Sequence, residues 1–345
     1  MRSEFSTDKF IWNQLLMECN YDFYHLPSYL DIEQDLIGGD SVFFYYENGL
    51  SKALIPFIKR KIDSSSYYDL VSPYGYAGIL INENFNHRDF NKVINNLEKS
   101  SMENNIVSAF IRLNPILNNF LFEESEQKKQ EIHGRTVFVS LQKPYEELFS
   151  HYSSNHKRNI KKLRKEGYFI KKNEWDEYEN WQRIYHDTME RLKASKYYYF
   201  DSVYFKKLKQ ELKNNLIFLS VHDRNGILAA GGLFTSFNGV IQYHLGGTNH
   251  DYLPFAPTKL MFDEIIKYGH ESQCEILHLG GGLGSEADSL FLFKSGFSKD
   301  TYRFSTLRLI TNKPIYDQLV QERSQILALK DIKDQSFFPL YRFEM

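Results

Sequence analysis

The chain has 345 residues, a length that suits two domains better than one. Its formal net charge of −2 argues against a polycation that binds nucleic acid over its whole surface. Cys19 and Cys274 lie far apart in no metal-ligand spacing, so we expect neither a disulfide framework nor a metal site. Without an apolar leader or a long apolar run, we expect a cytoplasmic protein with no transmembrane segment.

Helical and strand-like segments alternate along the chain, which is typical of an α/β fold with a mixed sheet. An Asn-Gly pair at residues 48–49 favours a tight hairpin turn. In the first half we predict, in chain order, a helix at 8–17, strands at 41–46, 53–58 and 67–71, a turn-rich loop at 72–78, a helix at 88–102 and a strand at 106–113.

The second half repeats this order, which indicates a structural duplication. It predicts a helix at 178–192, strands at 216–221, 227–236 and 240–245, a helix at 257–268 and a strand at 275–279. We therefore expect an N-terminal domain over 1–143 and a C-terminal domain over 144–312. Residues 313–345 are expected to add a helix to about residue 329 and a short strand at 337–343.

A strongly basic helix is predicted at residues 153–167. Lys157 and Arg158 begin its run of cations, which can hold a phosphate-bearing ligand. The alternative is a solvated helix face whose charge is balanced by the acidic residues at 174–179. The sequence favours the solvated face slightly for the helix as a whole.

Two glycine-rich strand ends carry the other chemical signals. Gly246 and Gly247 precede a helix whose first turn contains Thr258 and Lys259, a junction that can receive a pyrophosphate. Many folds place a helix after a strand in this way, so an ordinary junction is an equal alternative.

The second glycine-rich strand end is the run Gly280, Gly281 and Gly282, which lets another molecule approach the backbone closely. It precedes Asp288 and Lys294. Lys294 can meet developing negative charge, or it can be a surface lysine whose stem covers apolar neighbours. Asp288 can act chemically or simply cap a helix.

The segments Arg158–Gly167, Ile111–Pro115 and Asp288–Phe297, together with the glycine-rich strand ends, resemble the FemABX-type branch of the GNAT acyltransferases. The resemblance covers most of the chain and implies two tandem GNAT-like domains beside an active cleft. It implies that Lys294 matches the family lysine that stabilises negative charge. Two features depart from related patterns: Asn114 stands where peptidoglycan enzymes tend to have Asp, and no GNAT pyrophosphate signature precedes the helix at Pro257.

The resemblance also implies transfer of an acyl group, acetyl or aminoacyl, to an amine on a cell-envelope precursor or polysaccharide building block. The donor is acetyl-CoA or aminoacyl-tRNA, which leaves tRNA open as a partner. For the proton acceptor we consider His278, His244 and Asp288. We expect the acceptor to lie near Tyr74, Tyr76, Arg112 and Asn114. The alternative function is an inactive GNAT-like module that binds RNA or an anionic glycan through the basic helix.

Overall fold

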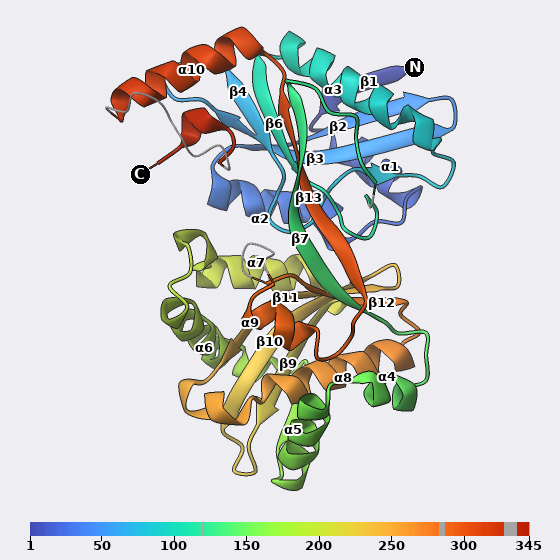
Figure 1. Ribbon diagram of the computed structural model, residues 1–345, viewed down its shortest axis with the longest axis vertical. Helices are drawn as coiled ribbons and strands as arrows, with labels where there is room; N and C mark the ends of the chain where they lie inside the picture. The colour runs from blue at the N-terminus through green and yellow to red at the C-terminus, as the bar shows by residue number, and fades with distance from the viewer. Residues whose placement is uncertain (119, 283–286, 328–336, 345) are drawn as a thin grey trace. The chain divides into compact units, whose positions relative to one another are not determined.

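The computed structural model describes residues 1–118, 120–282, 287–327 and 337–344 and divides the chain into two compact units. The first unit is formed by Met1–His133 together with Arg303–Met345, and the second by Gly134–Tyr302 (Figure 1). Within the described residues, no helix has the length and apolar character that crossing a membrane requires.

The first unit is a mixed sheet with helices on both faces. Its helices are α1 (Lys9–Met17), α2 (Pro27–Ile37), α3 (Phe90–Glu103), and α10 (Lys313–Ile326). Its strands are, in spatial order, β1 (Arg2–Ser6), β2 (Asp40–Asn48), β3 (Ser51–Lys61), β4 (Tyr68–Val71), β6 (Ile106–Arg112) and β13 (Thr301–Ile310), with β5 (Leu80–Ile81) paired to β3.

Apolar side chains alternate along the strands of the first unit, so each face of the sheet receives its own helices. Phe44 and Ile55 lie in one core together with Val93 and Leu97 of α3. On the opposite face, Phe43 contacts Trp12 of α1 with ring centroids 4.8 Å apart. The alternation of the strands thus accounts for the layered arrangement of this unit.

The second unit is also a mixed sheet between helices. Its helices are α4 (Tyr145–His151), α5 (Ser154–Lys165), α6 (Tyr178–Arg191), α7 (Ser202–Leu212), α8 (Thr258–Glu271), and α9 (Ser289–Lys294). Its strands are, in spatial order, β7 (Lys128–Ser140), β12 (Ile276–Gly280), β11 (Val240–Thr248), β10 (Leu228–Phe237), β9 (Leu216–His222) and β8 (Phe169–Lys172).

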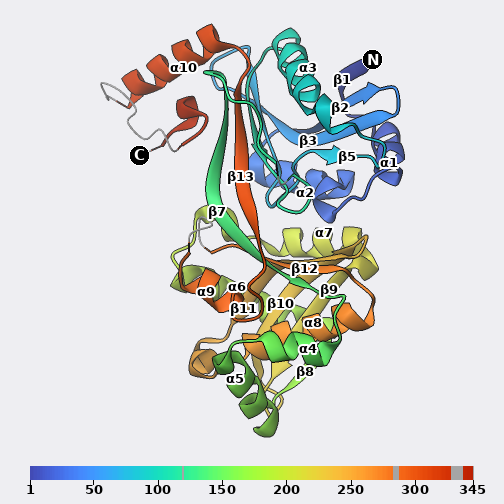
Figure 2. The ribbon, with the colours of Figure 1, turned by 45° about the vertical axis from the view of Figure 1, so that its right-hand side comes forward.

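The two faces of the second sheet differ in character. One face packs against α8 through aliphatic side chains such as Ile265 and Leu277, and α4 and α5 lie beside α8 (Figure 2). The other face is covered by α6 and α7 through large aromatic rings, among them Trp181, Phe205 and Phe218. The high aromatic content of the sequence is therefore used largely in packing.

The predicted duplication is visible in the strand pairing. In the first unit β4 and β6 are parallel and are joined through α3, and in the second unit β11 and β12 are parallel and are joined through α8. The strand that completes each sheet then comes from the other half of the chain. β13 pairs antiparallel with β6, whereas β7 pairs antiparallel with β12.

This exchange of strands explains why the compact units do not follow the expected segments 1–143, 144–312 and 313–345. β7 enters the second unit and β13 enters the first, so each half of the sequence contributes to both units. The long strands β7 and β13 are not among the strands that the sequence analysis predicted. Residues 313–326 and 337–344 pack on the first unit instead of forming a separate part.

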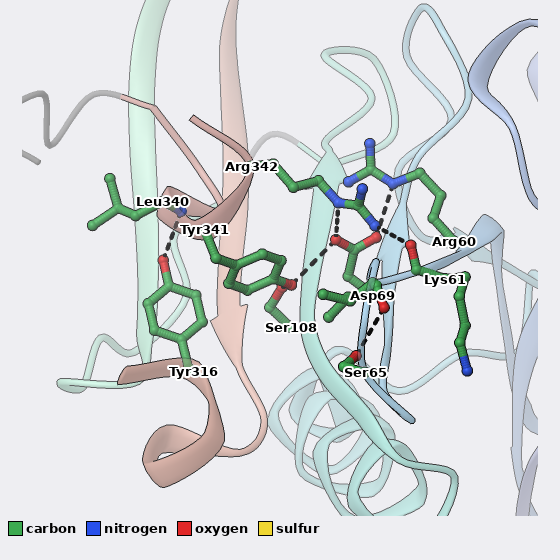
Figure 3. Close-up of polar contacts among 10 residues, drawn as sticks. Arg60, Lys61, Ser65, Asp69, Ser108, Tyr316, Leu340, Tyr341 and Arg342 are labelled. Atoms are coloured by element: carbon green, nitrogen blue, oxygen red, sulfur yellow. Dashed lines mark hydrogen bonds and ion pairs between the residues drawn. The ribbon is translucent and has the colours of Figure 1, made fainter. Parts of the chain in front are cut away.

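The predicted strand at 337–343 is wrong. The chain there carries a single 3-10 turn, Leu340–Arg342, held by side chains against β4 and β6. Tyr341 and Arg342 both reach Asp69, a carboxylate with no exposed surface (Figure 3). The side chains of Tyr341 and Arg342 hold this turn against β4 through Asp69. Of the predicted helix end near residue 329, the structure describes the part to Ile326, and the rest lies outside the described residues.

Candidate active site

The two parallel strands of the second unit separate partway along their length. β11 pairs with β12 from Val240 to Gln242, opposite Ile276 to His278. Beyond this point β11 continues to Thr248 beside β10, whereas β12 ends at Gly280. The separation leaves backbone groups of both strands without a partner in the neighbouring strand, which is a suitable place for an extended ligand.

Lys294 lies at this separation and is buried rather than displayed on the surface. It ends the short helix α9, and 6% of its surface is exposed. Its Nζ donates a 2.6 Å hydrogen bond to the carbonyl of Gly281 and lies 5.6 Å from the ring centroid of Tyr243. Burial lowers the pKa of Lys294 to about 7, although the nearby Asp288 opposes this shift. The surface-lysine alternative is therefore wrong.

The glycine run and Asp288 place Lys294. Gly280 adopts a φ of 74°, in the left-handed region that favours glycine, and the carbonyl that follows it receives the Lys294 ammonium. Asp288 caps α9 by accepting a hydrogen bond from the amide of Phe291 at 2.8 Å. Gly282 is partly exposed at the end of the run, and Ser285 and Glu286 lie outside the described residues.

The two candidate histidines lie on the face covered by α6 and α7, opposite the face of Tyr243. His278 Nδ1 lies 2.7 Å from the Gln242 side-chain oxygen, and His244 Nε2 lies 2.8 Å from the hydroxyl of Tyr204. Burial lowers the pKa of each histidine to about 3, and the charge of the nearby Lys294 adds to the shift of His278, so both rings are neutral near pH 7. A neutral ring can accept a proton, but neither ring shares the face of the sheet on which Tyr243 lies.

The space above Gly246 and Gly247 is filled by the protein. A Cβ atom added to Gly247 would lie 2.9 Å from the Cα atom of Tyr185 in α6, and one added to Gly246 would lie 2.1 Å from the Tyr243 hydroxyl. Both glycines therefore permit close packing inside the unit. The strand also runs three residues beyond its expected end at Leu245, through both glycines to Thr248.

Lys259 is brought together with two residues of α5. It lies in the first turn of α8 beside the half-buried Thr258, and its Nζ donates a 2.6 Å hydrogen bond to the Asn155 side chain. Burial, together with the nearby cation Arg158, lowers the pKa of Lys259. Two cations that approach each other at a helix start form a favourable environment for an anion.

Most cations of α5 are already engaged in contacts within the unit. Lys157 donates to the Ser150 carbonyl at the end of α4, and Arg164 forms a 2.6 Å ion pair with the fully buried Asp263. Lys162 pairs weakly with Glu166 at 3.7 Å. Arg158 and Lys165 have no hydrogen bond or ion pair to any part of the chain that the structure describes. The basic helix is therefore less open to a ligand than its composition indicates.

The remaining predicted residues lie in the first unit, around the loop at 72–78. Asn114 is buried and bonds the backbone on both sides: its amide donates to the Tyr76 carbonyl at 2.7 Å, and its oxygen accepts the amide of Ile116 at 2.9 Å. Arg112 donates to the Ser72 carbonyl at 3.3 Å, and Tyr74 is half-buried. These contacts hold the loop against the end of β6, and Asn114 suits this role because its amide both donates and accepts.

Sequence reasoning missed Tyr243, Asn155 and His156. Tyr243 lies between the buried polar residues Gln242 and His244 on β11. Its position at the separation of the strands can be inferred only when the parallel pairing of β11 with β12 is known. Asn155 and His156 were read as parts of a basic helix, although neither carries a charge that fits that description. Among the described residues, no group of three or more His, Cys, Asp or Glu side chains gathers into a metal site.

The paired parallel strands, the helix between them and the exchanged final strands define an α/β protein of tandem GNAT-like organisation. Comparison with solved structures agrees. The chain is similar to FemX with a TM-score of 0.69 and 13% identity, over 92% of this chain and 99% of that one. It is also similar to L-PGS from Bacillus licheniformis, with a TM-score of 0.56 and 17% identity, over 91% of this chain and 96% of that one.

A third similar structure is the C-terminal domain of a putative lysylphosphatidylglycerol synthetase from Agrobacterium fabrum, with a TM-score of 0.55 and 12% identity, over 93% of this chain and 98% of that one. No protein-family profile matches the sequence, and no curated protein matches it. These likenesses confirm the FemABX-like fold that the sequence resemblance implies.

Proposed function

We propose that the protein is an N-acyltransferase that moves an acyl group from an anionic carrier to an amine. The observation that carries this proposal is Lys294, a buried ammonium group held by the Gly281 carbonyl where β11 and β12 separate. Burial of a lysine destabilises a fold, and strongly perturbed groups of this kind gather at functional sites. The FemABX-like fold supports the same chemistry.

In the proposed reaction the nitrogen of the neutral amine attacks the carbonyl carbon of the acyl donor. The electron pair of the carbonyl bond moves to oxygen, and the charged oxygen is stabilised by the Lys294 ammonium. An electron pair of the charged oxygen then re-forms the carbonyl double bond as the bond between the carbonyl carbon and the carrier breaks. The carrier leaves with the electron pair of the broken bond and is neutralised by the proton that the amine releases. His278 and His244 are weak bases because the pKa of each is lowered to about 3, so we propose that water or Asp288 carries this proton from the amine to the carrier.

The carrier is proposed to bind at the start of α8. Lys259 and Arg158 supply two cations for a phosphate at the start of α8, beside the side chain of Thr258. Acetyl-CoA and aminoacyl-tRNA both present such phosphates, and the acceptor is proposed to be an amine of a cell-envelope precursor. The purified protein should be incubated with acetyl-CoA and with charged tRNA separately, while donor consumption is followed by mass spectrometry. Consumption of neither donor, with any amine supplied, would contradict the proposal.

Charge reversal at Arg158 is expected to weaken donor binding, whereas the same change at Lys165 is not. Both residues are exposed cations of α5 that form no ion pair with the described residues, but Arg158 lies near Lys259. Loss of one charge-assisted contact to phosphate predicts about tenfold weaker binding for Arg158→Glu at low salt, and the difference should shrink as salt rises. Isothermal titration with each donor measures it.

Equal losses in Arg158→Glu and Lys165→Glu would indicate general attraction by a basic helix, which is the behaviour of the alternative binding module. From the sequence alone, charge reversal at both Lys157 and Lys161 is also expected to weaken donor binding. Arg158 is the better position for this test. Reversal at Lys157 would remove the hydrogen bond to Ser150 and disturb α4.

A further inference from the structure

The first turn of α5 is attached directly to the helix that carries Lys294. His156 is 5% exposed, and its Nε2 lies 2.9 Å from the carbonyl oxygen of Phe293, the residue before Lys294. The amide of Ser153, the N-cap of α5, donates a 2.8 Å hydrogen bond to the carbonyl of Gly296. Two polar contacts therefore join the start of α5 to the last turn of α9 from either side of Lys294.

The imidazole ring of His156 is closely packed against two aromatic rings and a glycine. Its centroid lies 4.5 Å from that of Phe297 and 5.3 Å from that of Phe293. A Cβ atom added to Gly296 would lie 2.3 Å from His156 Nε2, so the glycine makes room for the ring. The contact is thus built from both elements, since α9 supplies the carbonyl and the aromatic pair, and the following glycine supplies the space.

The ring is held in one protonation state. Burial lowers the pKa of His156 to about 4, the hydrogen bond to Phe293 opposes this shift, and the cations Lys259 and Lys299 reinforce it. His156 is therefore neutral near pH 7. Because Nε2 faces a carbonyl oxygen, Nε2 carries the proton and donates. A neutral donor fixes the carbonyl of Phe293 without placing a second positive charge beside Lys294.

We propose that His156 is a positioning residue for Lys294, holding the last turn of α9 so that the ammonium group stays at the separation of β11 and β12. This inference rests on the proposed function for its kinetic consequence. Asn155, the neighbour of His156, accepts a hydrogen bond from Lys259. The first turn of α5 therefore contacts both the proposed carrier site, through Asn155, and the helix that carries Lys294, through His156.

His156→Leu tests the inference, because it keeps an apolar side chain and removes the donor. His156→Gln is the rescue variant, since its amide nitrogen can reach the position of Nε2. We expect the leucine variant to lower kcat about tenfold with little change in the KM for donor, and the glutamine variant to recover most of it. The pH at which Lys294 titrates, followed by NMR of isotope-labelled lysine side chains, should rise by about one unit in the leucine variant and return in the glutamine variant.

The matched control is His186→Leu. His186 also bonds a backbone carbonyl, that of Phe200 at 2.7 Å, in the same unit but on α6. The variant His186→Leu should leave both kcat and the titration of Lys294 unchanged. If His156→Leu does not fold, His156→Asn replaces it, because the shorter amide does not reach the Phe293 carbonyl.

An unchanged titration of Lys294 in His156→Leu or His156→Asn would overturn the inference, as would an equal change in His186→Leu. The titration is measured without any donor. A protein that consumes no donor therefore refutes the proposed function, while the NMR result still decides whether His156 positions Lys294.

Discussion

Lys294→Met is expected to slow turnover by about a hundredfold or more, the scale of losing one group that stabilises an oxyanion. The charge appears mainly in the transition state, so donor and acceptor binding should change much less than kcat. Methionine keeps most of the aliphatic stem and fits the apolar surroundings of Phe293 and Tyr243. Steady-state kinetics with saturating acceptor measures the effect.

The same substitution is expected to stabilise the fold. The pKa of Lys294 in the folded protein, about 7, lies below the value of roughly 10.4 of an unfolded lysine. Such a group favours the unfolded state whenever the pH is below its unfolded pKa, because unfolding allows it to take up a proton. At pH 8 Lys294→Met should therefore raise the midpoint of denaturant unfolding while it lowers the rate. A slower and less stable variant would indicate a structural lysine.

The pH dependence gives a second measurement on the wild-type protein. If the charged form of Lys294 stabilises the oxyanion, the rate divided by the fraction of neutral amine should decline as the pH rises above about 7. Lys299→Met is the matched control, because Lys299 is exposed and its Nζ bonds the Ser295 carbonyl at 2.8 Å near the end of α9. This control should retain the wild-type rate and the same decline. A wild-type turnover rate in Lys294→Met would place the site elsewhere.

The sequence predicted most of the repeated core because its signals are local. Short apolar runs identified β2, β3, β9 and β10, and the Asn-Gly pairs at residues 48–49 and 225–226 identified the hairpins between them. Helical periodicity identified α3 and α8, whose apolar stripes face the sheets. These features depend on residues that are neighbours in the sequence, which is why their order was sufficient to indicate the duplication.

The exchanged strands could not be predicted in the same way. β7 carries His133, Gly134 and Arg135 in its middle, and its partners are more than a hundred residues away in the sequence. The side-chain pattern of a strand belongs to its own residues, but nothing in that pattern indicates which distant strand it pairs with. Because these strands decide which residues belong to which unit, the expected domain limits differed from the observed units even though the helices and hairpins were correctly placed.

The sequence indicated some residues of the candidate site but not their arrangement in space. Lys294 was identified through the resemblance and the glycine-rich strand end, and the structure adds its burial and its bond to Gly281. The histidines of β11 and β12 were considered with it because histidine titrates near neutral pH. The sheet separates His244, which bonds Tyr204 of α7, from Tyr243, whose ring packs on Phe262 of α8.

Asp69→Asn is expected to destabilise the first unit by about 2–4 kcal/mol, since it leaves two arginines around a neutral group. Asp69 is fully buried and forms ion pairs with Arg60 at 2.8 Å and with Arg342 at 2.5 Å, and it accepts the hydroxyl of Tyr341 at 3.2 Å (Figure 3). The arginine side chains are 19% and 25% exposed, which places the loss toward the lower part of the range for a buried pair.

Asp317→Asn is the matched control for this substitution. Asp317 pairs with Lys313 on the exposed side of α10, where its side chain is 55% exposed, so its removal should cost less than about 1 kcal/mol. Denaturant unfolding compares the two variants. Hydrogen exchange should also show faster exchange at the amides of Arg342 and Phe343 in Asp69→Asn, because the turn that they close at Pro339 and Leu340 is anchored through Arg342. Equal stability losses in the two variants, or unchanged exchange in this turn, would mean that the apolar contacts of Tyr341 and Phe338 hold the C-terminal turn without the ionic network.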